Sequence, residues 1–444
     1  MFSYKFWFFV VGIPLLAITG GIAASLKYRS VMNERANAEL AAEVAKVQAC
    51  GEPLTGGELN AYYQTRKDRP DMTAEILAAL VPCKSIYPKN DHDHLPIIGS
   101  FGKEIPPPPQ TWPQLKECEE FLAKLQPTLE TFVAVYRRDG TAHYPVDFRE
   151  GIAAELPLYP LRNGTRRLSL QFHVALHRGR MEQARDCVLA EVAVGHTLDG
   201  IPLEDALTEK HSIFLLAIED IVLAAKHLPL ADEDIVTLRG ALSGMNFEED
   251  WNLSIISARA RAFSQCLNMH SKATYVPTSQ TTLRAKDAAM ILRVTRELKK
   301  AADKSFIAAL QNGPQIYDNV DALNEKSYPV TKVFLIGLPN MPYVVACRMA
   351  IRDTANLLLA CELYRRRHGR WPAALDVLVP EFVAAVPLDP FSTLPYRIAV
   401  TKEEFKVYSI GGGDQDDGGK LENRFGYGDP GFALPIAPDS RGTQ

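Results

Sequence analysis

The sequence predicts a mainly α-helical protein with an N-terminal transmembrane helix, a helical bundle and a small C-terminal module that combines a helix with strands. Three observations give this prediction. An uncharged apolar run lies close to the N-terminus, apolar residues recur every three or four positions between residues 115 and 338, and a long helical stretch precedes two strand-like runs near the C-terminus. A chain of 444 residues is long enough for about two or three domains.

The composition is that of an ordinary globular protein, with 23% charged residues and a net charge of −4. It shows no excess of positive charge, so we expect no nucleic-acid partner. The seven cysteines have no zinc-binding spacing. Cys118, Cys187 and Cys266 lie in apolar helical runs, where cysteine acts as a small hydrophobic residue. Cys50 and Cys83 flank a polar stretch and are the best candidates for a disulfide.

Residues 6–26 form an uncharged apolar run, long enough to cross the roughly 30 Å hydrocarbon core of a membrane. We therefore predict a membrane anchor over residues 1–28, with membrane lipid as its partner. Small residues at positions 23–25 resemble a signal-peptide cleavage site, but the apolar run is long for a signal peptide, which favours an uncleaved anchor. A segment lying on the membrane surface is a third alternative.

The two segments after the anchor differ in proline content. Residues 29–81 begin with an alanine- and glutamate-rich stretch and are predicted to form a helical stalk. Residues 82–113 contain several prolines, including the run at 106–109, and proline does not fit inside a helix. We expect an extended linker here, or a strap that lies on the body.

Residues 114–340 are predicted to form a helical domain. Segments 168–176 and 184–197 are typical of an antiparallel helix pair joined at residues 177–180. The Ala-Leu-x-x-Gly-Arg-x-x-x-Ala spacing over residues 175–184 is similar to a tetratricopeptide (TPR) turn, but no clear period of about 34 residues follows it. A plain helical hairpin is therefore favoured over TPR-like hairpins.

A later helix is predicted to end at Asn312-Gly313-Pro314, which is a strong signal for the end of a helix. Its basic residues predict a solvated helix face, and contact with anionic lipid or an acidic partner is the alternative. These residues are Arg293, Arg296, Lys299, Lys300 and Lys304.

Residues 341–436 are predicted to form an α+β module, followed by a short tail at 437–444. Residues 343–367 have the pattern of a long helix, which ends where Gly369 can adopt a left-handed cap and Pro372 cannot continue the helix. Two predicted strands and a loop rich in glycine and aspartate follow. The predicted strands span residues 395–400 and 404–410.

Four features of this module, in this order, resemble the C-terminal half of the major, G-type pseudopilin of type II secretion. They are the helix end LACELYRRRHGRWPAAL at 359–375, the motif Pro-Leu-Asp-Pro-Phe at 387–391, the strand end Val-Tyr-Ser-Ile-Gly at 407–411, and the acidic glycine-rich loop after it. The resemblance covers about a fifth of the chain and implies a pseudopilin-like fold. The remainder is similar only to bacterial envelope proteins without an assigned role. The N-terminus lacks the leader, processing glycine and glutamate of that family, so we do not expect a processed filament subunit.

The charges beside the anchor and the C-terminal resemblance predict opposite orientations. Lys5 precedes the apolar run, whereas Lys27, Arg29 and Arg35 follow it. The positive-inside rule then places the body in the cytoplasm. The resembled family lies outside the membrane, and on that ground we favour a bacterial inner-membrane protein with one span and a periplasmic or extracytoplasmic body.

In the resembled family the acidic loop binds calcium, which implies a Ca²⁺ site at Asp414, Asp416, Asp417 and Asp429. Ca²⁺ takes about six to eight oxygen ligands in a flexible cage, which carboxylates and turned backbone carbonyls can supply. A gapless match puts Gly413 where the family has its first loop aspartate. An exposed acidic turn without metal is therefore the alternative.

The rest of the sequence shows no catalytic signature. The run Asp-His-Asp-His at 91–94 is interpreted as a loop, because neighbouring residues of an extended chain point to opposite sides. His173 with His177, and His211 with Glu219, are interpreted as residues of a helical bundle without a catalytic partner. The sequence contains no GxSxG, HExxH, Walker or dinucleotide-binding glycine motif.

We therefore expect a non-enzymatic, membrane-anchored envelope protein whose helical body binds protein partners and whose tail is a pseudopilin-like, calcium-binding module. No small-molecule substrate is evident. Two alternatives are a pseudopilin component of a secretion system and a membrane-anchored enzyme with an unrecognised site.

Overall fold

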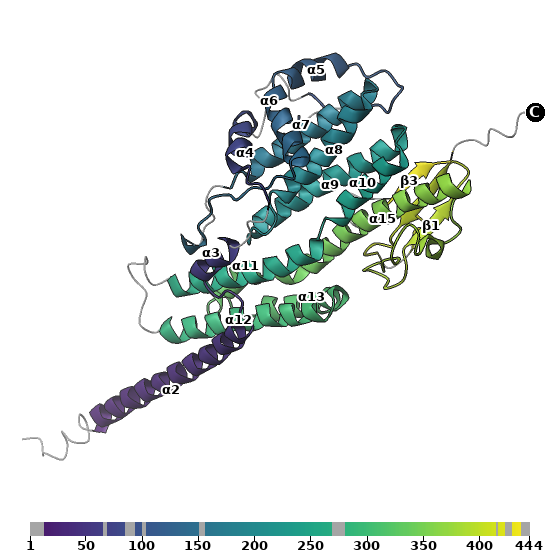
Figure 1. The fold of residues 1–444 in the computed structure, drawn as a ribbon. Helices are drawn as coiled ribbons and strands as arrows, with labels where there is room; N and C mark the ends of the chain where they lie inside the picture. Colours follow the sequence, from purple (N-terminus) through teal and green to yellow (C-terminus); the bar gives the residue numbers. More distant parts are fainter. Residues whose placement is uncertain are drawn as a thin grey trace, which may run out of the picture.

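The computed structural model describes residues 13–64, 69–84, 94–99, 104–150, 156–268, 280–413, 416–421 and 429–436. Over these residues the chain is mainly helical and has one small antiparallel sheet near its C-terminus, as the sequence predicts. Figure 1 shows a layered helical body from which helix α2 projects, with the sheet beside helix α15.

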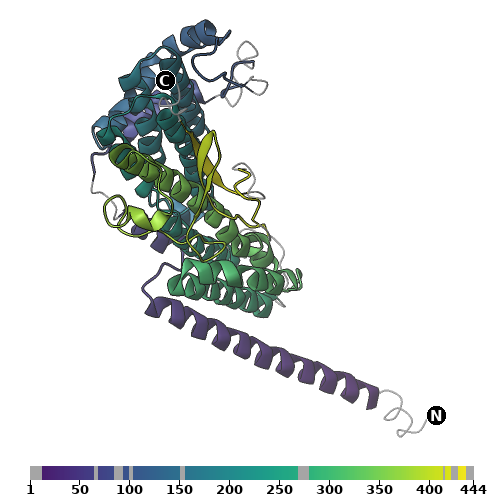
Figure 2. The same cartoon turned by 90° about the vertical axis from the view of Figure 1, so that its right-hand side faces the viewer.

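Helix α2 (Ile13–Ala49) joins the described part of the predicted anchor to the start of the predicted stalk without a break. Its 37 residues span about 55 Å at about 1.5 Å per residue. Its buried side chains, among those described, are Ala36, Glu43 and Val47, whereas residues 23–30 are exposed. Figures 1 and 2 both show its first half leaving the body. Residues 1–12 lie outside the described residues, so the membrane anchor remains a prediction.

The helices that follow α2 make up the body, and some of the predicted stalk and linker residues belong to it. They are α3 (Gly56–Gln64), α4 (Thr73–Ala79), α5 (Leu115–Ala123), α6 (Gln126–Arg137), α7 (Leu158–His177), α8 (Met181–His196), α9 (Glu204–His227), α10 (Asp232–Ser243), α11 (Phe247–Asn268), α12 (Gln280–Lys304), α13 (Phe306–Asp321), α14 (Pro329–Leu335) and α15 (Met341–His368). Helices α7 and α8 form the predicted hairpin. Gly179 in its turn has a φ of 67°, a conformation that favours glycine.

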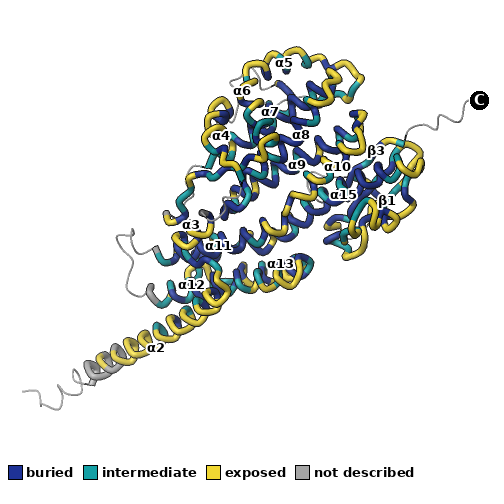
Figure 3. The backbone as a smooth tube through the Cα atoms, viewed as in Figure 1, coloured by how far each residue is buried: buried dark blue, intermediate teal, exposed yellow. Residues whose placement is uncertain are grey.

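One described stretch, Pro329–His368, is long and apolar enough to cross a membrane by length and composition alone. It lies near the C-terminus and consists mainly of α14 and α15. Helix α15 packs against α9, α10, α11, α13 and the sheet. Figure 3 shows it largely buried, whereas α2 is exposed along most of its described length. In this structure α15 is therefore the central helix of the body.

The predicted helix end at residues 312–314 is wrong, because α13 continues through these residues. The break lies earlier, at Ser305, whose side chain accepts a hydrogen bond from the backbone N–H of Ala308 and so caps α13. Gly313 does not end the helix; its lack of a side chain allows the backbone at Pro339 to pack closely against α13. A Cβ at this position would lie 2.3 Å from the carbonyl oxygen of Pro339.

Two basic residues of α12 contact helix α2. Arg293 pairs with Glu39, and Arg296 pairs with the buried Glu43 at 3.1 Å. The sequence predicts that the basic face of this helix is solvated, but at Arg293 and Arg296 it contacts α2. It lies where α2 meets the body.

Part of the proline-rich segment lies on the body as a strap. Its described residues 104–113 pass α7, where Nε2 of His177 donates a hydrogen bond of 2.8 Å to the carbonyl oxygen of Pro106. The buried Trp112 contacts the same imidazole ring. The sequence predicts either an extended linker or a strap for residues 82–113. The described residues 104–113 form a strap.

Buried apolar side chains form two clusters. One gathers mainly residues of α3 to α9. The other begins at Val47 of α2, continues through α8 to α15 and ends at Leu434 near the C-terminus. Among the described residues, packing is therefore continuous across residue 341, where the sequence suggests a domain boundary.

The sheet has the order β1-β2-β3, with antiparallel neighbours β1 (Arg397–Val400), β2 (Glu404–Tyr408) and β3 (Gly431–Pro435). The first two confirm the predicted strands, whereas β3 was not predicted. Phe405 and Leu434 are paired in register and buried, and Trp371 stacks on Phe405 at 4.4 Å. The predicted long helix is α15, and Gly369 caps it with a φ of 70°.

Asp389 connects the Pro-Leu-Asp-Pro-Phe motif to the end of β2. Its buried carboxylate accepts hydrogen bonds from the backbone N–H groups of Phe391 and Ile410 and from the hydroxyl of Ser409. A buried carboxylate needs such donors. Two of the four features that carry the pseudopilin resemblance therefore form one hydrogen-bonded unit.

The seven cysteines are free, so the predicted pairing of Cys50 with Cys83 is wrong. Cys50 is exposed at the end of α2, whereas Cys83 is fully buried in the body. Cys118, Cys187 and Cys266 are buried, as the sequence predicts. Burial raises the pKa of Cys118 and Cys266 to about 12.

Candidate functional site

The described aspartates of the predicted calcium site lie in the segment between β2 and β3. Gly418 and Gly419 adopt φ values of 69° and 78°, which turn the backbone beside Asp416 and Asp429. The backbone N–H of Gly418 donates to Asp416, and that of Gly419 donates to Asp429. Asp414 lies outside the described residues.

Asp429 is the member of this set best suited to bind a cation. Its side chain is buried, and Oδ2 accepts the 3.0 Å hydrogen bond from Gly419. Its other oxygen, Oδ1, is buried and makes no hydrogen bond of ordinary geometry, although the backbone N–H of Asp417 approaches the carboxylate and favours its charged form. Burial, and to a lesser degree the nearby Asp417, raises the pKa of Asp429. A buried carboxylate oxygen in this state needs either a proton or a cation.

Asp416 and Asp417 fit the predicted site less well. Asp416 pairs with Arg397 of β1, so it already has a cationic partner. Asp417 is exposed. In the described part of the chain, no three His, Cys, Asp or Glu side chains are arranged to hold a metal ion. Calcium binding by Asp414, Asp416, Asp417 and Asp429 therefore remains a prediction.

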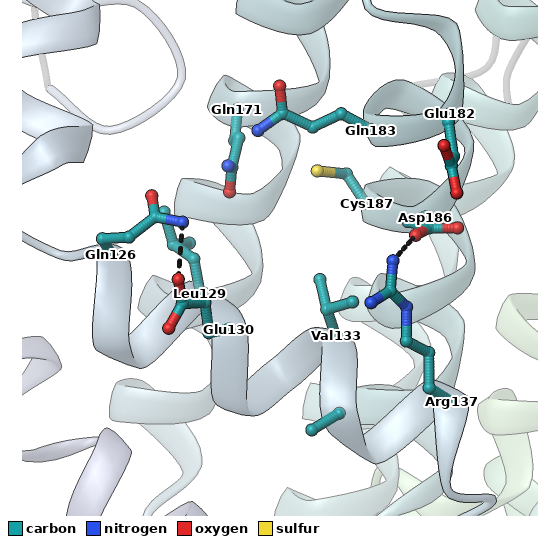
Figure 4. Close-up of a pocket in the computed structure, with 11 residues that line it drawn as sticks. Gln126, Leu129, Glu130, Val133, Arg137, Gln171, Glu182, Gln183, Asp186 and Cys187 are labelled. Carbon is teal, nitrogen blue, oxygen red and sulfur yellow. Dashed lines mark hydrogen bonds and ion pairs between the residues drawn. The ribbon is translucent and has the colours of Figure 1, made fainter.

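A cavity of about 420 Å³ lies between α6, α7 and α8. Figure 4 shows side chains from these helices surrounding an open space, with Gln171 of α7 and Gln183 of α8 on one side and residues of α6 on the other. Leu129 and Val133 of α6 supply apolar surface. A volume of this size accommodates a small molecule or one side chain of a partner protein.

Acceptor groups outnumber donor groups around this pocket. Among the described residues that line it, the carboxylates are Glu130 of α6 and Glu182 and Asp186 of α8, and the one cationic group is Arg137. The guanidinium of Arg137 lies 2.5 Å from Oδ2 of Asp186, so that charge is already neutralised. The pocket is thus acidic, with a net charge of about −2 from these four groups.

A pair of buried carboxyl groups lies one turn beyond the pocket along α8. Glu191 is fully buried next to Asp220 of α9. Burial, followed by the charge of Asp220, raises the pKa of Glu191 well above its usual range. Nε2 of His173 lies 3.5 Å from Asp220. Two neighbouring buried carboxyl groups thus disfavour the state in which both are ionised.

A second cavity, of about 360 Å³, is lined by His196 at the end of α8, and this histidine is paired with Asp199 behind it. Nδ1 of His196 lies 2.9 Å from Oδ2 of Asp199. Lys210 lies 2.6 Å from the other oxygen of Asp199 and 2.8 Å from Asp250 of α11. Hydrogen bonds from His196 and the charge of Lys210 outweigh the effect of burial and lower the pKa of Asp199 to about 2.

The histidines that the sequence singles out lie in the bundle. His211 is buried and lies 2.9 Å from Asp250, so it belongs to the same charge network as Lys210. His173 contacts Asp220, and His177 contacts the strap. Sequence reasoning missed His196 and Asp199, although their spacing of three residues at a helix end is a recognisable signal.

Comparisons of the chain with protein families, with curated proteins and with solved structures find no match. The resemblance of the C-terminal module to pseudopilins therefore remains a prediction from its sequence features.

Proposed function

We propose that this chain is a non-enzymatic, membrane-anchored scaffold of the bacterial envelope. Its N-terminal helix holds it in the inner membrane, and its body lies on the periplasmic or extracytoplasmic side. Protein partners bind the helical body, and the C-terminal module provides a pseudopilin-like contact surface.

One observation supports this proposal most directly: α15 belongs to two structures at once. It packs on the bundle helices α9, α10 and α11, and its other side carries the sheet. The module therefore shares the core of the body. Such an arrangement suits a scaffold, which has to present two surfaces in a fixed relation.

The pocket between α6, α7 and α8 is the proposed point of contact with a partner. It is open to solvent, acidic and formed by side chains of three helices. Figure 1 shows α2 leaving the body at the end opposite to α6, α7 and α8, which would leave these helices facing away from a membrane that holds the anchor.

Calcium binding by the tail is part of the proposal. Oδ1 of Asp429 would be the first ligand, because it is buried and makes no hydrogen bond of ordinary geometry with the described residues. A ligand that binds only the folded state stabilises it by about 2.7 kcal/mol at a hundredfold excess over its Kd. We expect calcium to raise the melting temperature of the full chain, and Asp429→Asn to remove the shift. An unchanged melting temperature in calcium and in chelator would eliminate this site.

Site-specific photo-crosslinking in native membranes tests the scaffold. A photoreactive residue at position 183, on the pocket rim, is expected to give a discrete product with another protein. Position 333 on α14 is the matched control, because Val333 is 72% exposed and lies away from the pocket helices. Equal products at both positions, or none at 183, would contradict the proposed contact.

The pair of His196 and Asp199 favours a second candidate, a membrane-anchored enzyme. Asp199 orients the imidazole through Nδ1, which leaves Nε2 for a substrate or a water molecule in the cavity. A panel of ester and phosphoester substrates tests it. Turnover that disappears in His196→Gln would support an enzyme, and absence of turnover by the wild type would support the scaffold.

The third candidate, a pseudopilin component of a secretion system, predicts a different mature N-terminus. Mass spectrometry of the protein from its native membrane decides the matter. Removal of a short leader supports the pseudopilin component, and an intact anchor supports the scaffold.

A further inference from the structure

We infer that the pocket between α6, α7 and α8 binds the guanidinium group of an arginine side chain presented by the partner protein. This inference rests on the proposed scaffold function and specifies the chemistry that the partner brings to it.

The first observation is a buried acceptor that has no donor. Gln171 of α7 is 8% exposed, and its Oε1 is buried without a hydrogen-bond partner among the described residues. Leaving such an acceptor unpaired costs about 1–3 kcal/mol. Gln171 lines the pocket, so a donor that enters the cavity can pair with it.

The second observation is the charge of the wall. Glu130 accepts one hydrogen bond, of 3.1 Å from the amide of Gln126, and Glu182 is exposed. Asp186 holds Arg137, so the pocket has no uncommitted cation for an anionic ligand. The remaining acceptors attract a positively charged group that donates several hydrogen bonds.

The third observation is the apolar surface beside these acceptors. Leu129, Val133 and Ala134 lie along one side of α6 and line the cavity. An arginine side chain has an apolar stem and a planar head with five donors, so it can cover this surface and still reach Gln171 and Glu130. A lysine has the stem, but its ammonium has three donors and lacks the planar fork.

Isothermal titration of the full detergent-solubilised chain tests the inference. The probe is N-acetyl-arginine amide, and the matched neutral probe is N-acetyl-citrulline amide, which has the same shape without the charge. We expect heat of binding for the arginine compound, at least about tenfold weaker binding for the lysine analogue, and none for citrulline; tenfold corresponds to about 1.4 kcal/mol. Equal signals for arginine and citrulline would overturn the inference.

Two variants locate the binding. Glu130→Gln is expected to weaken binding of the arginine probe about tenfold. Glu120→Gln, on the neighbouring helix α5 and outside the pocket, is expected to leave it unchanged. If Glu130→Gln loses helicity by circular dichroism, Glu182→Gln replaces it with the same expected direction. Equal affinity in wild type and in folded pocket variants would overturn the assignment.

A polyamine carries similar chemistry, and spermidine is therefore included as a competitor. If spermidine binds more tightly than N-acetyl-arginine amide, the ligand of the pocket is a free polyamine and not an arginine side chain of a protein. That result would overturn the inference. The two proposals can fail separately. If the arginine probe binds but no partner crosslinks at position 183, the proposed contact of the scaffold with a partner is wrong. If a partner crosslinks but the pocket shows no preference for arginine, the inference of a guanidinium ligand is wrong.

Discussion

The two long helices α2 and α15 differ in what surrounds them. Helix α2 projects from the body, and its buried side chains, among those described, are Ala36, Glu43 and Val47. Helix α15 is enclosed by other helices and by the sheet, and Leu358, Leu359 and Ala360 are fully buried. Both begin from apolar sequence, yet we assign one to the membrane and the other to a protein core.

The comparison teaches that hydropathy alone does not decide the environment of a helix. A core helix can carry charges if they find partners, and α15 does. Glu362 receives hydrogen bonds from Arg365 and Arg366 in the same helix, and Arg366 also donates to the carbonyl oxygen of Leu230 outside it. The described first half of α2 has exposed apolar side chains at Leu26 and Tyr28. Exposed apolar surface on a projecting helix is what a membrane would cover.

The largest expected effect follows from deleting residues 1–28. The truncated chain should leave the membrane completely and stay folded, because the buried contacts of α2 begin at Ala36. Carbonate extraction and sedimentation of both forms, with circular dichroism of the soluble one, check this. If the truncated chain is folded but remains in the membrane, the membrane anchor is α15 or another segment and not α2.

A large loss of stability is expected for Leu358→Ala in α15. Leu358 is fully buried, and removing its side chain leaves a cavity that costs about 2–5 kcal/mol. Val333→Ala on the neighbouring α14 is the control, since Val333 is 72% exposed and should change the free energy by less than about 0.5 kcal/mol. Urea unfolding measures both. Equal effects would mean that α15 is not a core helix.

A smaller, pH-dependent effect is expected for Glu362→Gln. Burial acts to raise the pKa of Glu362, but hydrogen bonds from Arg365 and Arg366 outweigh it, and the pKa is lowered. The carboxylate therefore stabilises the fold above the pKa of the unfolded chain, and this stability is lost as the pH falls through the lowered value. The variant should be destabilised by about 1–3 kcal/mol at pH 7 and lose that difference in acid. A difference independent of pH would contradict the ion pair.

The smallest effect is expected where α2 meets α12. Reversing the pair as Glu43→Arg with Arg296→Glu should restore most of the stability that either single change removes. Double-mutant cycles of ion pairs near the surface typically give a coupling of about 0.2–1 kcal/mol, which is the range expected here. A double-mutant cycle by thermal unfolding measures the coupling between the two residues. Coupling near zero would mean that apolar contacts such as Val47 hold α2 to the body.

The sequence was sufficient for elements whose signals are local. The hairpin of α7 and α8, the cap at Gly369 and the strands β1 and β2 follow from periodicity and turn residues. The prediction that a helix ends at Asn312-Gly313-Pro314 was wrong because Gly313 serves a different purpose. It allows close approach of Pro339, and a local sequence pattern does not indicate such a contact between segments. β3 was missed because five residues after a loop rich in glycine carry a weak pattern.

The candidate sites were less predictable for the same reason. The pocket takes Glu130, Gln171 and Glu182 from three helices, and their proximity depends on how these helices pack. The basic residues of α12 likewise found partners in α2, more than two hundred residues away in the chain. In contrast, Asp429 was singled out by its sequence context, and the structure shows it buried.

Labelling of Cys50 with a membrane-impermeant maleimide in intact spheroplasts tests most directly whether the body lies outside a membrane that only α2 enters. Cys50 is the exposed cysteine at the end of α2, and burial raises the pKa of the Cys347 thiol to about 11, so that it reacts slowly. We expect labelling of Cys50 in intact spheroplasts and its loss in Cys50→Ser. Labelling that appears only after the membrane is opened would place the body in the cytoplasm, opposite to the proposed orientation.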